Sequence, residues 1–70
     1  MMPNYPLRTA INNLFERYPD RRFSINEIRA LINSRESHEY MYNQLEDMAN
    51  HNAIYKFASG FPQPNKYGLN

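Results

Sequence analysis

Residues 23–28 of this 70-residue chain, Phe-Ser-Ile-Asn-Glu-Ile, contain the signature of a helix start. In a capping box, a serine hydroxyl accepts a hydrogen bond from the backbone N–H three residues later, and a glutamate at that later position bonds back to the serine N–H. Ser24 and Glu27 have this spacing. Phe23 and Ile28 flank them as a hydrophobic staple, which sets the angle at which the chain enters the helix. The pattern predicts a helix directly after Ser24.

Apolar residues at helical spacing predict one helix before this start and one after it. The first covers about residues 6–18, with a proline that suits a first helical turn. Its other face begins with Arg8 and is expected to be solvated. The capped helix covers about residues 25–33, and the third covers about residues 37–51.

The third predicted helix has a cap candidate at Ser34 or Ser37. Asn52 can end it, because asparagine tolerates the left-handed conformation found at many helix ends. Its apolar stripe comprises Met41, Leu45 and Met48. A turn of about 100° per residue places Tyr42 at the flank of this stripe, where we expect it to pack in the core, and Tyr40 toward solvent.

Residues 53–69 follow a different pattern. The first six alternate as a strand does, a Ser-Gly pair opens a turn, and Lys-Tyr-Gly-Leu can return as the partner strand. Pro62 and Pro64 favour a loop between the two strands. Alternatively, the two prolines occupy outward-facing positions of an edge strand. Phe61 then lies either at an exposed tip or folded back on a short ribbon. We predict a mainly α fold with a small β-ribbon, in a single domain over residues 1–70.

Two segments resemble the winged helix-turn-helix superfamily. Residues 23–28 are similar to the start of its second helix, and residues 45–56 are similar to the end of its third helix and the first wing strand. The family usually has glycine at the position of Asn52, a mild difference because both residues tolerate the left-handed conformation. The resemblance covers about residues 23–57 and implies a three-helix winged helix-turn-helix. An unrelated three-helix bundle with a loose tail is the alternative.

In this superfamily the third helix enters the major groove of DNA, and the wing contacts phosphate or the minor groove. The resemblance therefore implies a small DNA-binding regulator of transcription or replication, of the phage, prophage or plasmid type. The residues implied to lie near bases are Arg35, Ser37, Tyr40, Asn43 and Gln44, and those implied at phosphates are Arg21, Arg22, Lys56 and Lys66. With so few cations one module should bind weakly, so we expect a homodimer on double-stranded DNA.

The charge distribution argues against this implication. Although the net charge is only +1, residues 1–35 carry six arginines against three acids, whereas residues 36–70 carry two lysines against four acids. The exposed face of the third helix is thus predicted to be acidic, while affinity for DNA comes largely from lysine and arginine at phosphates. The second hypothesis is a protein-interaction module, such as a small phage-type inhibitor or adaptor. Its contact residues would be Glu36, Glu39, Tyr40, Asp47 and Phe61.

The sequence lacks the residues that several classes of function require. The chain has no cysteine, and therefore no disulfide, thiolate metal site or cysteine nucleophile. The His38–Glu39 pair lacks the second histidine of a helical zinc site, because Tyr42 occupies that position. With two glycines there is no glycine-rich phosphate loop. We expect no catalytic, metal or cofactor site. Lacking a signal sequence and a long apolar run, the protein should be cytoplasmic with no membrane partner.

Overall fold

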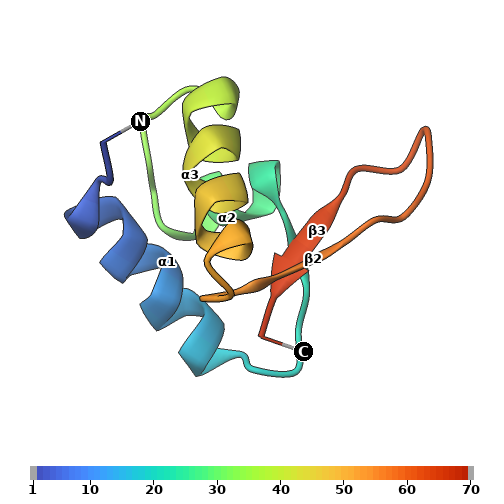
Figure 1. Cartoon of the computed structure of the whole chain (residues 1–70), viewed down its shortest axis with the longest axis horizontal. Coiled ribbons are helices and arrows are strands. Elements are labelled where there is room, and N and C mark those ends of the chain that lie inside the picture. Colours follow the sequence, from blue (N-terminus) through green and yellow to red (C-terminus); the bar gives the residue numbers. More distant parts are fainter. Residues whose placement is uncertain (1, 70) are drawn as a thin grey trace.

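The computed structural model describes residues 2–69 and has six elements of secondary structure. In chain order they are α1 (Tyr5–Arg17), β1 (Phe23–Ser24), α2 (Ile25–Leu31), α3 (His38–Asn50), β2 (Tyr55–Phe57) and β3 (Lys66–Gly68). Figure 1 shows the three helices gathered together and the β2–β3 ribbon extending away from them. The predicted fold class, mainly α with a small β-ribbon, is confirmed, and the arrangement is compatible with a winged-helix shape.

The sheet has one more strand than the sequence patterns predict. Phe23 and Ser24 of β1 pair antiparallel with Tyr67 and Lys66, so the strand order is β1-β3-β2. On the other side of β3, Tyr67 pairs with Lys56 of β2. Two residues are too few for alternation to be recognised, and the phenylalanine predicted as a staple is also a strand residue. The last strand of the chain is therefore attached to the entry of α2.

Side chains cap all three helices, and the caps are Asn4, Ser24 and Ser37. The predicted capping box is complete, because Ser24 Oγ accepts from the Glu27 N–H at 3.2 Å and Glu27 Oε1 accepts from the Ser24 N–H at 2.9 Å. Of the two candidates for α3, Ser37 is the cap and accepts from the Tyr40 N–H at 3.1 Å. Short polar residues therefore determine where each helix begins.

Asparagines in the left-handed conformation follow α2 and α3. Asn33 has a φ of 54° and Asn52 has a φ of 62°. After α3, the N–H of Asn52 donates to the carbonyl of Ala49 at 3.0 Å, and the next N–H donates to the carbonyl of Met48 at 3.0 Å. These two bonds satisfy carbonyls that a helix end otherwise leaves unpaired. The predicted role of Asn52 as a helix end is confirmed.

The core lies between the helices and one face of the sheet. Its buried apolar side chains are Leu7, Ile11, Leu14, Phe15, Phe23, Ile25, Ile28, Met41, Leu45, Met48, Ile54 and Tyr67. They include the predicted stripe of α3 and both residues of the predicted staple. Phe15 of α1 and Phe23 of β1 stack with ring centroids 5.7 Å apart and an angle of 3° between the ring planes. This aromatic pair joins the first helix to the sheet.

Residues 58–65 form the loop between β2 and β3, as the prolines favour, and we call this ribbon with its loop the wing. Gly60 has a φ of 79°, and the N–H of Gln63 donates to the carbonyl of Gly60 at 2.8 Å, so Phe61 and Pro62 are the central residues of a turn. The side chain of Phe61 is 102% exposed. Of the two alternatives for Phe61, the exposed tip is the one found. Figure 1 shows this loop at the far end of the ribbon.

The cap of α2 can be tested by Ser24→Ala, which removes the acceptor for the Glu27 N–H. We expect the free energy of unfolding, measured by urea denaturation at pH 7, to fall by about 1 kcal/mol. Ser59→Ala in the exposed wing loop is the matched control and should change stability little. A Ser24→Ala variant as stable as the control would show that this hydrogen bond does not hold the start of α2.

Candidate nucleic-acid interface

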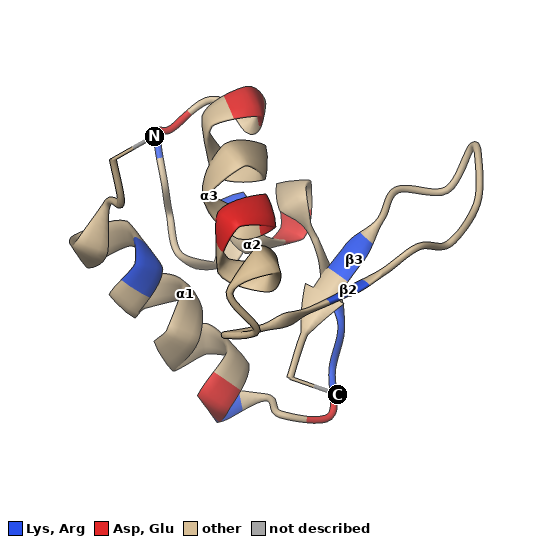
Figure 2. Cartoon of the chain, in the orientation of Figure 1, with Lys and Arg blue, Asp and Glu red and all other residues tan. Residues whose placement is uncertain are grey.

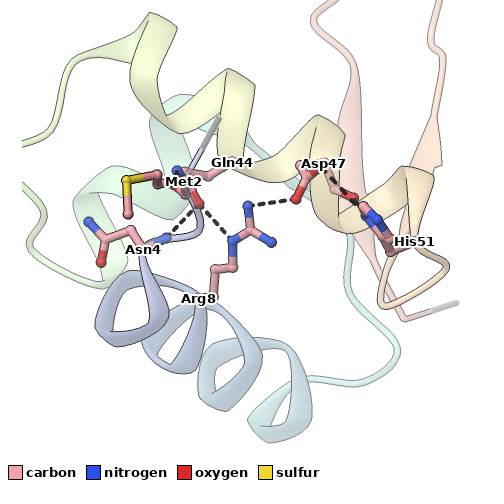
Figure 3. Close-up of polar contacts among 6 residues, drawn as sticks. All are labelled: Met2, Asn4, Arg8, Gln44, Asp47 and His51. Carbon is pink, nitrogen blue, oxygen red and sulfur yellow. Dashed lines mark hydrogen bonds and ion pairs between the residues drawn. The ribbon is translucent and has the colours of Figure 1, made fainter.

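One flank of α3 is joined to α1 and to the start of the chain by polar contacts (Figure 3). The Gln44 side chain is fully buried, and its Oε1 accepts from Arg8 Nε at 2.7 Å and from the Asn4 N–H at 3.2 Å. Its Nε2 donates to the Met2 carbonyl at 3.4 Å. Nη2 of Arg8 pairs with Asp47 Oδ2 at 2.8 Å. The prediction that Gln44 contacts bases is therefore wrong, as is the expected solvation of Arg8, whose side chain is 15% exposed.

The two tyrosines of α3 are placed opposite to expectation. Tyr40 is half-buried against the core, and its hydroxyl accepts from Asn4 Nδ2 at 3.0 Å. Tyr42, which was expected in the core, is 40% exposed. The physical reason is a second stripe on α3, comprising Tyr40, Gln44 and Asp47, which faces the start of the chain and α1. Because these side chains are polar, the apolar pattern alone did not reveal that they are covered.

Two of the three acidic side chains within α3 are paired inside the fold. Asp47 has the arginine of α1 as its partner. The Glu46 carboxylate lies 3.1 Å from Nζ of Lys56 in β2, and it accepts a hydrogen bond from the Tyr67 hydroxyl at 2.7 Å. Only Glu39 remains as an exposed acid on this helix. The acidic surface predicted for the third helix is therefore largely neutralised, and Lys56 is held in an ion pair.

Burial, together with the hydrogen bond to the Glu46 carboxylate, raises the pKa of Tyr67 above its ordinary value of 10.0. A raised pKa stabilises the fold fully below pH 10, and this contribution is lost as the pH rises above that value toward the folded-state pKa. We expect Tyr67→Phe to lose about 1–2 kcal/mol at pH 7, because the hydrogen bond to the carboxylate is lost.

Urea denaturation from pH 8 to 11 tests the contribution of the Tyr67 hydroxyl. Tyr67→Phe should lose less stability above pH 10 than the native chain, whereas the control Ser59→Ala, which removes an exposed hydroxyl from the wing loop, should follow the native curve. Parallel pH curves for Tyr67→Phe and the native chain would contradict a role for this hydroxyl.

The outward side of α3 and the turn before it carry the other predicted base-contacting residues. Asn43 is exposed, with Tyr42 beside it in the sequence and Glu39 one turn earlier. Arg35 is exposed in the turn that precedes the helix. The hydroxyl of Ser37 already caps α3, so it has a structural partner in the fold. The outward side of α3 is thus mainly uncharged and rich in amide and phenol groups.

Arginines lie on aromatic rings where the chain enters the sheet. The guanidinium of Arg22 lies 3.7 Å from the ring centroid of Phe57 in β2. The guanidinium of Arg21 lies 4.8 Å from the ring centroid of Phe23 and 5.3 Å from that of Tyr18. Cation–π attraction holds such groups in place. Both arginines are exposed at this end of the sheet, and their contact with phosphates stays a prediction.

Lys66 extends this positive charge onto β3. It is exposed and is the cross-strand neighbour of Phe57, so its side chain lies on the face of the sheet where the Arg22 guanidinium stacks. The pKa of nearby Glu27 is lowered, mainly by the hydrogen bond from the Ser24 N–H and further by the charges of Lys66 and Arg21. We call Arg21, Arg22 and Lys66 the basic patch. In Figure 2 its blue segments lie at the base of the ribbon.

A groove of about 370 Å³ lies between α1 and the end of α2. It is lined by Ala10, Asn13, Leu14, Arg17, Tyr18, Leu31 and Ile32. Arg17 and Tyr18 are its ionisable residues, so it has no carboxylate or histidine for acid–base chemistry. Among residues 2–69, no three His, Asp or Glu side chains are placed to hold a metal ion. The same residues form no helix that is long and apolar enough to cross a membrane.

The acidic residues predicted for a protein interface are dispersed. Asp47 is engaged with α1, while Glu36, before α3, is half-buried and its carbonyl accepts from Arg29 Nε at 2.9 Å. Glu39 and Phe61 are both exposed.

A scan against protein-family models and searches of curated proteins and of solved structures find no match to this chain. The geometry therefore assigns two candidate surfaces, the outward side of α3 and the basic patch with the wing.

Proposed function

We propose that this chain is a small winged-helix protein that binds double-stranded DNA and regulates transcription or replication. The observation that carries the proposal is the internal pairing of Glu46 and Asp47. These two carboxylates would otherwise bring negative charge to a duplex that is itself densely negative. With both acids paired in the fold, the main electrostatic objection to a DNA-reading third helix is much weaker.

Two groups of residues have the chemistry that a duplex requires. Asn43 on the outward side of α3 has an amide that can form a bidentate pair with adenine in the major groove. The basic patch supplies cations for phosphates, and Arg35 lies before the start of α3. Residues 48–70 contain two lysines and no acidic residue, so the wing brings no side-chain carboxylate to the phosphates. Because the cations are few, we propose that the protein acts as a homodimer.

Fluorescence anisotropy with a mixed-sequence duplex tests the proposal. Affinity should fall steeply between about 50 and 200 mM salt, because binding releases counterions from the phosphates. Lys66→Gln should weaken binding and reduce the slope of log affinity against log salt by about one. Arg29→Gln removes the same charge from α2 and should leave that slope unchanged. Absence of binding at low salt, or binding that salt does not weaken, would refute the proposal.

Exposed apolar groups support a second candidate function, a protein-interaction module. Phe61 is fully exposed, and Leu31 at the groove between α1 and α2 is 52% exposed. Tyr42 is the exposed tyrosine of α3, whereas the sequence predicted exposure for Tyr40. If no duplex binds, a partner recovered from host lysate and lost on Tyr42→Ala or Phe61→Ala would select this function. Retention of the partner by both variants would exclude these surfaces.

A further inference from the structure

We infer that the wing tip is an intercalating wedge, in which Phe61 inserts between base pairs from the minor groove of a bound duplex. The inference rests on the proposed function, because a wedge acts only on DNA that the protein already holds. In this role the wing tip unstacks one base step and bends the duplex, which differs from contacting phosphates.

The placement of Phe61 is the first observation. Its side chain is fully exposed in the loop of residues 58–65, and Figure 1 shows this loop at the far end of the ribbon, away from the helices. Core packing therefore does not account for a large apolar side chain at this position. Such a ring gains most by entering an environment without water. A base stack provides one, with flat aromatic surfaces on both sides of the ring.

The geometry of the turn is the second observation. Gly60 takes a positive φ and its carbonyl accepts from the Gln63 N–H, so Phe61 and Pro62 occupy the two central positions. The centre of this turn is thus an apolar pair. Phenylalanine and proline are among the residues that architectural proteins insert between base steps from the minor groove.

The residues around the tip are the third observation. Gln63 and Asn65 follow the wedge, and amide side chains can bond the acceptors that A·T pairs present in the minor groove. Lys66 is the first residue of β3, where the chain returns from the loop. The absence of an acidic residue in positions 48–70 favours a polyanion over a basic protein surface as the occupant.

The test uses short duplexes that contain 2-aminopurine, whose fluorescence rises when it is unstacked, and duplexes with a fluorophore pair at their ends. Bound to saturating native protein at about 50 mM salt, the first set should brighten at one step. The second set should show the shorter end-to-end distance of a bent duplex. Phe61→Ala should abolish both signals and weaken binding about tenfold, as truncation of a buried aromatic anchor does.

Two variants sharpen the result. Phe61→Leu keeps an apolar wedge and should retain part of both signals. Tyr5→Ala removes another exposed aromatic ring, at the start of α1, and should behave as the native protein. Because Phe61 contributes nothing to the core, Phe61→Ala should melt at the native temperature, so a lost signal will not reflect unfolding.

The outcomes separate the wedge from the proposed function. If the native protein binds no duplex, both are overturned. If it binds with the expected salt dependence but neither signal appears, or if Phe61→Ala retains both, the wedge alone is overturned. A Phe61→Ala variant that binds and bends DNA normally but loses a protein partner would reassign the tip to protein contact.

Discussion

Phe23→Ala is expected to remove about 3–5 kcal/mol from the free energy of unfolding, the usual range for a buried aromatic side chain. A domain of this length typically has about 4–10 kcal/mol in total. Phe23 is fully buried, stacks on Phe15 and pairs in the sheet with Tyr67. Its loss would therefore leave a cavity where α1, the sheet and the start of α2 meet. We expect a large unfolded fraction at 25 °C.

Urea denaturation followed by circular dichroism measures this effect. Phe57→Ala is the matched control, because Phe57 is also a strand phenylalanine beneath an arginine but is only half-buried on the outer face. It should lose much less stability than Phe23→Ala. Phe23→Leu should lie between the two, since leucine fills part of the cavity. Equal losses at positions 23 and 57 would contradict the central place of Phe23 in the core.

Asp47→Ala is expected to destabilise the fold by about 2–3 kcal/mol, because it leaves a largely buried guanidinium without its anion. The side chains of Arg8 and Asp47 are 15% and 29% exposed, so water replaces the lost partner only in part. The Arg8 Nε would still be held by Gln44, which keeps the charge near its buried position. This loss of stability is smaller than the loss expected for a fully buried ion pair, because some solvent reaches the carboxylate.

A double-mutant cycle isolates this ion pair. Arg8→Met and Asp47→Ala should each destabilise the protein, but the double variant should lose less than the sum of the two, by about 1 kcal/mol or more. Thermal and urea unfolding at pH 7 supply the four free energies. Strict additivity would show that the two charges do not stabilise each other. Asp47→Asn should leave DNA affinity unreduced under conditions where the variant is folded, because this carboxylate lies at the contact with α1.

Local signals predicted much of the fold. The Ser24–Glu27 box, the stripe of α3 and the left-handed Asn52 each depend on residues close together in the chain, so their geometry follows from short-range sterics and hydrogen bonds. The predictions that failed depend on distant partners. The helical spacing placed Tyr40 toward solvent and the family resemblance placed Gln44 near bases. Their polar groups are instead satisfied by Met2, Asn4 and Arg8, which lie between 36 and 42 positions earlier in the chain.

The residues of the basic patch were singled out from the sequence, and their role at phosphates stays a prediction. Arg21, Arg22 and Lys66 were assigned to phosphates, and all three are exposed. Their assembly into one patch depends on β1, a strand of two residues that has no alternation by which to identify it. The charge of the third helix was counted correctly, but a count of charges does not reveal which carboxylates have an internal partner. Glu46 and Asp47 find theirs on β2, β3 and α1.

By itself, the sequence determined the start of α2, the end of α3 and that a loop with two prolines separates two strands. Those features arise from backbone geometry and bonds within a few residues. Only the tertiary structure decided which polar side chains are covered, that a third strand closes the sheet, and that Phe61 stands free at its tip. These outcomes depend on which elements pack together, because burial and charge pairing are properties of groups brought close in space and not of their order in the chain.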